Sequence, residues 1–400
     1  MRRPDVHRMS DGTKLNRNEL LAHLITVAPN FIAPYVQLAS FLENDELITL
    51  ADGRKYSRRE VLLKALEVDS KNAAALYLLS TLLGKNESIV LLNGKKKSKQ
   101  DLLAAAADNS ESHLIFSALG GCLAIGDKIV LEHSGTTVTK KDCYVAALRQ
   151  VAKADYLFNL ATCIASSERV VIEYPPRTGT EIDCDRKELY ILALEHNSEM
   201  PSAWYGLATQ LAANVSVTVN QKPFTKQSCL VQALTLDPSH AMAFASLAST
   251  LKDDEVVTTS DGATYNRKQC YLAAIERNSA YADAYCNLGT ALSTTETITN
   301  RAATITLTKR DCYLIAIQHN PSHAIAYFGL GNTLAKKGET VALLNGTVVG
   351  RRDCYLETLR HNPKHTLALK GIAASMTDAE VVTLHDGRKI TKKEWENPRL

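Results

Sequence analysis

A block of about forty residues recurs along the chain, and this periodicity constrains the fold more than any single motif does. In each copy one aliphatic residue precedes a small residue. These anchors are Leu38, Leu79, Leu119, Leu160, Leu207, Leu247, Leu288, Leu330 and Ile372. Successive anchors lie 40–42 residues apart, except for one step of 47 residues. Such a period predicts stacked units that each contact their neighbours, and it disfavours a globular enzyme with a single pocket.

The composition suits a repeat protein without a strongly charged partner. Of the 400 residues, 45% are hydrophobic, which is enough for a continuous core, and the net charge of +3 gives no general attraction to nucleic acid. We find no apolar run long enough to span a membrane. The first residues lack the apolar segment of a secretory signal, so we expect reduced cysteines and a cytoplasmic location, with the nucleus as the alternative.

The clearest copy, residues 324–363, predicts two helices in each repeat. The first helix, residues 324–334, places Tyr327, Leu330 and Leu334 at helical spacing. The second helix, residues 351–363, ends at an Asn-Pro turn. Capping boxes mark the start of most second helices. The expected pairs are Ser57 with Glu60, Ser98 with Asp101, Thr139 with Asp142, Asp185 with Glu188, Asn266 with Gln269, Thr308 with Asp311, and Thr391 with Glu394.

A short alternating segment separates the two helices of each repeat, and its centre is an Asx-Gly dipeptide such as Asn345-Gly346. Because Asx-Gly supplies the two positive φ angles of a type I′ turn, the segment predicts a β-hairpin. The other clear copies are Asp52-Gly53, Asn93-Gly94, Asp261-Gly262 and Asp386-Gly387, with a partial copy at Asp11-Gly12. The weaker copies are residues 220–222, residues 301–303 and the longer loop 174–180.

These positions resemble the tetratricopeptide (TPR) repeat. The aromatic, Leu and Gly positions of that family match Tyr327, Leu330 and Gly331 in the first helix. Tyr313, Ala316 and Pro321 match its positions in the second helix. The resemblance covers nearly all of residues 16–395, but the hairpin replaces the simple turn of the usual unit.

The resemblance implies a mainly α fold, a right-handed α-solenoid of about nine TPR-like helix pairs, each with a short β-hairpin insertion. We expect a single solenoid over residues 1–400. Its repeats are expected at 31–70, 72–110, 112–152, 153–198, 200–238, 240–279, 281–321, 323–363 and 365–396, after a partial repeat at 5–30.

In the TPR family the first helices build the concave face, and this implies a binding groove here. One implied row is Ser40, Thr81, Gly121, Thr162, Thr209, Ser249, Thr290, Asn332 and Ala374. A second row is Val36, Tyr77, Phe158, Tyr205, Ala245, Cys286, Phe328 and Lys370. The set of Asn and basic residues with which some members hold a C-terminal carboxylate is incomplete, so we disfavour that type of ligand.

Cysteines recur at one position of the second helix, and we interpret them as core residues. Other copies fill the same position with a hydrophobic residue, and adjacent copies stand too far apart for a disulfide. The cysteines are Cys143, Cys229, Cys270, Cys312 and Cys354. Cys184, in the longest hairpin, is expected to be the exposed exception. Neither these cysteines nor the histidine pairs His319–His323 and His361–His365 complete a metal site, so we expect no metal and no cofactor.

Two cations follow the N-cap of many second helices, as in Lys309-Arg310 and Arg351-Arg352. Cations at this end oppose the helix macrodipole. Either neighbouring acids, such as Glu46, Glu255 and Glu380, neutralise them, or they form a stripe for an anionic partner; we favour neutralisation. The densest patch, and the best candidate for anion contact, is Lys95, Lys96, Lys97 and Lys99.

Since no catalytic motif is present, we expect a non-catalytic scaffold that binds a protein or peptide. The groove residues expected to carry this function are Tyr77, Phe158, Tyr205, Phe328, Thr81, Thr162, Thr209, Ser249, Thr290 and Asn332. Two alternatives stay open. The cation pairs could bind RNA or phosphoinositide, although nucleic acid is disfavoured, or the chain could self-assemble through its hairpins or its terminal repeats.

Overall fold

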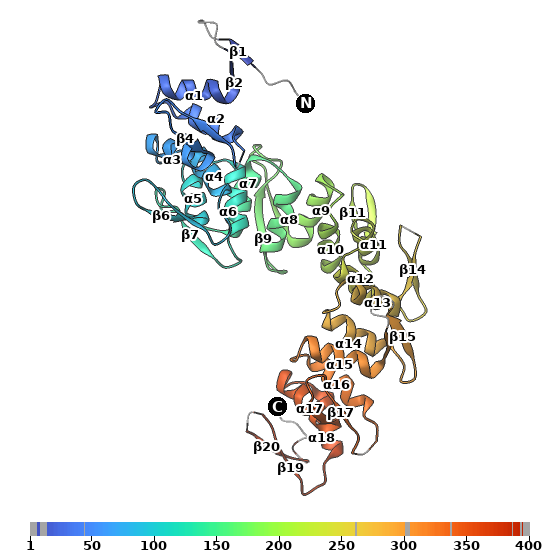
Figure 1. Ribbon diagram of the computed structural model, residues 1–400. Coiled ribbons are helices and arrows are strands. Elements are labelled where there is room, and N and C mark those ends of the chain that lie inside the picture. Colours follow the sequence, from blue (N-terminus) through green and yellow to red (C-terminus); the bar gives the residue numbers. More distant parts are fainter. Residues whose placement is uncertain are drawn as a thin grey trace. The chain divides into compact units, whose positions relative to one another are not determined.

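The computed structural model describes residues 6–8, 14–43, 45–260, 262–300, 305–336, 338–385, 387–392 and 394. The chain forms two compact units, Met1–Ser198 and Glu199–Leu400. Within each unit a first helix, a hairpin and a second helix follow one another repeatedly (Figure 1). The structure confirms a mainly helical fold of repeated helix pairs with hairpins between them. The expected repeat boundaries and the single solenoid remain predictions.

In the first unit, the first helices are α2 (Ile32–Phe41), α4 (Ala73–Thr81), α6 (His113–Cys122) and α8 (Ala154–Cys163). The second helices are α1 (Arg17–Val27), α3 (Arg58–Val68), α5 (Lys99–Ala107), α7 (Lys140–Gln150) and α9 (Arg186–His196). The hairpins pair β1 (Val6–Arg8) with β2 (Lys14–Asn16), β3 (Leu47–Thr49) with β4 (Lys55–Ser57), β5 (Ser88–Val90) with β6 (Lys96–Ser98), β7 (Lys128–Val130) with β8 (Thr137–Thr139), and β9 (Arg169–Glu173) with β10 (Glu181–Asp185).

In the second unit, the first helices are α10 (Pro201–Gln210), α12 (Ala241–Thr250), α14 (Ala282–Ala291), α16 (Ala324–Thr333) and α18 (Thr366–Ser375). The second helices are α11 (Lys226–Leu236), α13 (Arg267–Arg277), α15 (Lys309–His319) and α17 (Arg351–His361). The hairpins pair β11 (Ser216–Val219) with β12 (Lys222–Thr225), β13 (Val256–Thr258) with β14 (Thr264–Asn266), β15 (Thr297–Asn300) with β16 (Ile305–Thr308), β17 (Thr340–Ala342) with β18 (Val348–Gly350), and β19 (Val381–Thr383) with β20 (Lys389–Thr391).

Capping boxes begin the second helices where the spacing predicts them. In α3, the Ser57 side chain accepts from the Glu60 N–H, and a Glu60 carboxylate oxygen accepts from the Ser57 N–H at 2.7 Å. Thr391 and Glu394 make the corresponding contact at the last described residues. Two further boxes, not predicted from the sequence, join Asn16 with Glu19 and Thr225 with Ser228. The remaining predicted boxes are present at Ser98, Thr139, Asp185, Asn266 and Thr308.

The hairpins are present, but the predicted type I′ turn is wrong for the described Asx-Gly loops. Gly53 has a φ of 75°, whereas Asp52 is not among the residues with a positive φ. The Gly53 N–H donates to the Leu50 carbonyl, which is the pattern of a type I turn followed by a left-handed glycine. Two consecutive positive φ angles occur instead at Asn220 and Gln221, in the two-residue loop between β11 and β12. Asp11, Gly12, residues 301–303, Asp261 and Asp386 lie outside the described residues.

The core is the seam between first and second helices. All nine anchors, from Leu38 to Ile372, have an exposed fraction of 0%. The five cysteines of the second helices are also 0% exposed, which confirms their interpretation as core residues. Cys184 was predicted to be exposed, and this is wrong: it is 3% exposed because alternate residues of β10 face the helices.

Tyrosines of second helices pack between glycines of consecutive first helices. The ring of Tyr313 on α15 lies against Gly289 of α14 and against Gly329 of α16. Tyr355 on α17 lies in the same way between Gly331 of α16 and Gly371 of α18. Since glycine has no Cβ, both neighbouring first helices approach the ring closely. This contact links three successive helices.

Candidate functional site

The first predicted groove row lies on the exposed side of the first helices in both units. Each of its nine residues is exposed. Their hydroxyl protons are already used: Thr81 Oγ1 donates to the Leu78 carbonyl at 2.6 Å, and Thr209 Oγ1 donates to the Gly206 carbonyl at 2.6 Å. The same contact to the residue's own helix occurs at Ser40, Thr162, Ser249 and Thr290. These hydroxyls can therefore accept hydrogen bonds from a ligand, but they have no free proton to donate.

The second predicted row is largely committed to internal packing. Phe158 lies 5.9 Å from the Tyr190 ring, and the Phe328 ring lies 4.6 Å from His365. Tyr77, Phe158, Tyr205 and Phe328 are half-buried, so each offers part of its ring to a ligand. Ala245 and Cys286 were expected on the groove surface, but they are 7% and 1% exposed because neighbouring helices cover them. The accessible surface is thus a row of small side chains beside partly covered rings.

Histidines at the starts of three first helices act as caps. Nδ1 of His240, His323 and His365 accepts the N–H of the residue three positions later, at 3.2–3.3 Å. An accepting Nδ1 places the proton of a neutral imidazole on Nε2. In His323 that Nε2 lies 3.0 Å from Asp283 Oδ1 and can donate to it. The three histidines therefore have a structural role as helix caps, which was not foreseen from the sequence.

The first helices are also almost free of charged residues. In the nine first helices, α2 to α18, the residues with a formal charge at neutral pH are Asp155, Asp283 and Lys370. Charged residues make up 22% of the whole chain, so they are concentrated in the second helices, hairpins and turns. The exposed side of the first helices therefore suits a neutral ligand better than an ionic one.

The paired cations of the second helices have two separate structural roles. In α5, α7, α9 and α15 the first cation donates to a carbonyl at the end of the first helix of its own repeat, where carbonyls lack intrahelical partners. Lys140 Nζ donates to the Leu123 carbonyl at 3.1 Å, and Lys309 Nζ donates to the Leu292 carbonyl at 2.9 Å. A cation that would oppose the macrodipole of its own helix thus complements the macrodipole of the helix beside it.

The second cation reaches forward to the acid that opens the next hairpin, 27–29 residues along the chain. We call each such pair an inter-repeat clamp. Lys141 pairs with Glu168 at 2.7 Å, and the same contact joins Lys268 to Glu296, Arg310 to Glu339, and Arg352 to Glu380. Each glutamate also accepts a backbone N–H in the turn after the first helix, as Glu296 does from Ser293 at 3.2 Å. These contacts support the interpretation that neighbouring acids neutralise the cation pairs.

The clamps predict a loss of stability at acid pH. The hydrogen bond from Lys268 lowers the pKa of Glu296 below its ordinary value of 4.5, and the hydrogen bond from Arg352 does the same to Glu380. A carboxyl whose pKa is lower in the folded state stabilises the fold above pH 4.5, and this contribution disappears as the pH falls through the lowered value. We expect the urea midpoint to fall between pH 5 and 3, as measured by circular dichroism.

A variant with Glu168→Gln, Glu296→Gln and Glu380→Gln isolates this effect. It should be less stable than the wild type at pH 7 and should lose less stability between pH 5 and 3. Asp254→Asn, at an exposed turn position, serves as the control and should keep the wild-type pH profile. An unchanged acid slope in the triple variant would show that the clamps do not set the pH dependence.

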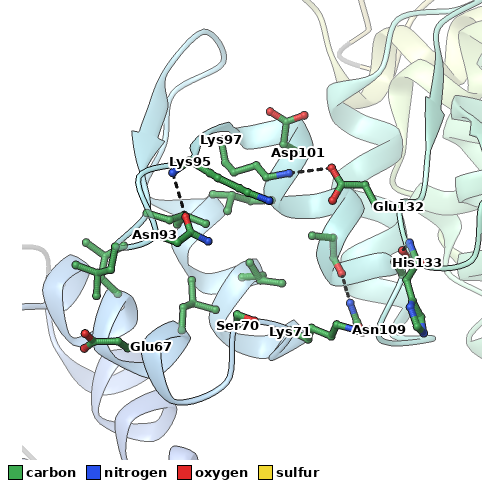
Figure 2. Close-up of a pocket in the computed structure, with 18 residues that line it drawn as sticks. Glu67, Ser70, Lys71, Asn93, Lys95, Lys97, Asp101, Asn109, Glu132 and His133 are labelled. Carbon is green, nitrogen blue, oxygen red and sulfur yellow. Dashed lines mark hydrogen bonds and ion pairs between the residues drawn. The ribbon is translucent and has the colours of Figure 1, made fainter.

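Two of the four lysines predicted to contact anions, Lys95 and Lys97, line a cleft in the first unit (Figure 2). The cleft has a volume of about 780 Å³ and lies between α3, α5 and the hairpins β5–β6 and β7–β8. Lys97 pairs with Glu132 at 3.0 Å, and Lys99 Nζ donates to the Leu83 carbonyl at 3.0 Å. Lys95 lines the cleft, whereas Lys96 is exposed and does not line it. The four lysines therefore do not converge on one anion.

No protein-family model and no curated protein matches the chain. Among solved structures, the chain is similar to yeast Tom70, with 11% identity over 89% of this chain and 76% of that chain and a TM-score of 0.33. It is also similar to YrrB, a TPR protein with an unusual peptide-binding site, with 15% identity over 77% and 96% of the two chains and a TM-score of 0.19. A monomeric mutant of IFIT1 with Gppp-AAAA matches with 12% identity over 90% and 70%, and a TM-score of 0.29.

These neighbours are TPR-type proteins. At such TM-scores the likeness carries no inference about ligand or function. The class of protein follows instead from the repeated unit of first helix, hairpin and second helix: the chain is a helical-repeat protein with TPR-like helix pairs. In the described part of the chain no helix is long and apolar enough to cross a membrane.

Proposed function

We propose that this chain is a non-catalytic scaffold that binds a neutral segment of a partner protein on the exposed side of its first helices. The observation that carries the proposal is the near absence of charge on these helices, although their outward residues are exposed. Apart from Lys370 on α18, the first helices carry no Lys, Arg or Glu. Such a surface is suited to contact with a neutral chain, because charged residues are depleted at the centre of protein interfaces.

The small side chains of the first groove row determine which hydrogen bonds the surface can offer to such a segment. Hydroxyls at Thr81 and Thr162 in the first unit, and at Thr209, Ser249 and Thr290 in the second, have only lone pairs to offer, and Asn332 lies in the same row. Backbone N–H groups of an extended segment are suitable donors to them. The half-buried rings of Tyr77, Phe158, Tyr205 and Phe328 would contact its apolar side chains.

Binding of anions by the cation pairs is the weaker alternative. Lys140 and Lys309 donate to helix-terminal carbonyls, and Lys141, Lys268 and Arg310 are in ion pairs with glutamates of the next hairpin. RNA or a phosphoinositide would have to displace these internal partners. The cytoplasmic location remains a prediction.

Selection from a display library of random 12-residue peptides tests the proposal. We expect the selected peptides to be apolar and low in charge, and their Kd to change less than threefold between about 50 and 300 mM salt. In the full chain, Tyr205→Ala combined with Phe328→Ala should weaken at least tenfold the binding of those selected peptides that bind to the second unit. Thr209→Arg with Asn332→Arg, at exposed positions, should do the same without removing buried rings.

The matched control is Leu344→Ala with Val348→Ala, which removes two apolar side chains that are 57% and 63% exposed on the loop and strand of hairpin β17–β18. This variant should bind like the wild type. Selection of acidic peptides whose affinity collapses with salt would support the anion-binding alternative instead. If all three variants bind the peptides as tightly as the wild type does, the peptides do not bind to the first helices.

A further inference from the structure

The cleft of Figure 2 combines apolar and polar side chains. Its volume of about 780 Å³ lies within the range of roughly 300–1,000 Å³ that is typical of small-molecule sites. Leu66 and Leu102 in its lining are buried, whereas Leu92 is 59% exposed. The half-buried leucines of the lining are Leu63 and Leu91. The cleft therefore offers apolar surface to a ligand of limited size.

Contacts between neighbouring elements hold the walls of this cleft together. Helix α5 has nine residues, whereas α3 and α7 have eleven. Directly after the early end of α5, Asp108 accepts the N–H groups of His133 and Ser134 in the loop of hairpin β7–β8, the latter at 3.0 Å. The ion pair between Lys97 and Glu132 joins hairpin β5–β6 to the same loop. Walls that are joined in this way favour binding, because little has to be ordered when a ligand enters.

Three of the four acids that line the cleft have internal partners. Asp108 and Glu132 make the contacts given above, and Asp101 accepts the Ser98 N–H at 2.8 Å in the capping box of α5. The fourth acid is Glu67, near the end of α3. Figure 2 shows its carboxylate on the side of the cleft away from the labelled lysines. The acids therefore leave little negative charge free near those lysines.

Two lysines of the lining have side chains without an acidic partner. Within the described residues, neither Lys71 nor Lys95 forms an ion pair, and Figure 2 shows them at opposite ends of the cleft. Asn93 Oδ1 accepts the backbone N–H of Lys95 at 3.0 Å, and its Nδ2 remains free to donate. The end of the cleft at Lys95 therefore has an ammonium group and an amide donor for an anion.

We propose that this cleft binds an amphipathic anion, an apolar chain that ends in a carboxylate. The carboxylate accepts from Lys95 and Asn93, and the chain covers the leucines of the lining. Burial of the chain supplies most of the binding free energy, and the charged end fixes the orientation. The cleft lies among second helices and hairpins, so this site does not depend on the proposed peptide binding by the first helices.

Isothermal titration calorimetry of the full-length chain with decanoate tests the proposal. We expect one decanoate per chain, with a Kd of about 1 mM or lower. Octanoate should bind about tenfold more weakly, because two fewer CH₂ groups are buried. Decanol and decylammonium have the same chain and should bind at least fivefold more weakly than decanoate, because neither brings a negative charge to Lys95.

Two substitutions separate the polar part of the site from the apolar part. Lys95→Ala should weaken decanoate at least fivefold and leave decanol unchanged. Ala105→Leu introduces the residue that α9 has at the equivalent position, Leu192, and should weaken both ligands by narrowing the cleft. Lys96→Ala is the matched control, because Lys96 is exposed and does not line the cleft, and it should bind decanoate like the wild type.

Circular dichroism of each variant checks that the fold is unchanged. Absence of decanoate binding to the wild type at about 1 mM, the expected Kd, would overturn the proposal. Decylammonium that binds as tightly as decanoate would also overturn it. So would an equal loss of decanoate binding in Lys95→Ala and Lys96→Ala, because the lysines would then act only through their general charge.

Discussion

Replacing Gly329 by alanine is expected to lower the free energy of unfolding by about 1–3 kcal/mol, the usual cost of overfilling a packed core. A Cβ at this position would lie less than 3.0 Å from three atoms of the Tyr313 ring. The space around the ring is limited, because it also lies against Gly289 of α14. Either the ring or α16 must move, and the contact that joins three helices is disturbed.

Gly121→Ala is the control for helix propensity. No atom lies within 4 Å of a Cβ at this helical position, so the exchange should stabilise the protein by about 0.5–1 kcal/mol. Combining Gly329→Ala with Tyr313→Leu should recover part of the loss, because leucine occupies the tyrosine position at Leu62, Leu103 and Leu230. Urea unfolding measures all three effects. A Gly329→Ala protein as stable as the wild type would show that the helices are not held at this spacing.

Six of the nine thiols are expected to be almost inert in the folded protein. Burial raises the pKa of Cys143, Cys229, Cys270, Cys312 and Cys354 to about 12, and it does the same to Cys286. Because the thiolate is the reactive form, a pKa of 12 in place of the ordinary 9.0 reduces its population about a thousandfold at neutral pH. Reaction with an aromatic disulfide reagent at pH 7.5 should therefore be at least a thousandfold slower at these six thiols than in the unfolded chain.

Cys122 and Cys163 are half-buried and should be the first to react. Burial raises the pKa of Cys163, so it should be slower than a free thiol. Cys122→Ser should remove one reacting group from the folded protein, and all the remaining thiols should react in guanidinium. Three thiols lie outside these six. If more than three thiols react before the protein unfolds, the second helices separate from their neighbours far more readily than their packing indicates.

The features set by local spacing could be predicted from the sequence, and those set by packing between repeats could not. The capping boxes depend on residues three positions apart, and every predicted box is present, although two others were missed; the predicted anchors are all buried. The turn type was wrong because the loop between Thr49 and Lys55 has five residues, and this length selects a type I turn despite its Asx-Gly dipeptide. The exposure of Cys184 was wrong because it depends on which face of the hairpin the helices cover.

For the candidate site, the exposed row followed from the resemblance to the TPR repeat, but the burial of Ala245 and Cys286 depends on neighbouring helices that the pattern of one repeat does not reveal. The partners of the cation pairs were foreseen only as nearby acids. Their distribution, one to the preceding helix end and one to the next hairpin, requires the spacing of stacked repeats. The low charge of the first helices was visible in the sequence and could have been recognised there.

The inter-repeat clamps have a consequence for exchanging modules between positions. A repeat that is moved to another position brings the cation of one inter-repeat clamp on its second helix. It also brings the glutamate of another clamp, directly before its hairpin. Transplanted modules should thus join well wherever both neighbours supply the missing halves. The junction that follows α5 is different, since Gln100 replaces the cation and donates to the Cys122 carbonyl. A repeat inserted after α5 would not need to supply a glutamate for an ion pair at this junction. Repeats should therefore be easiest to exchange or add there.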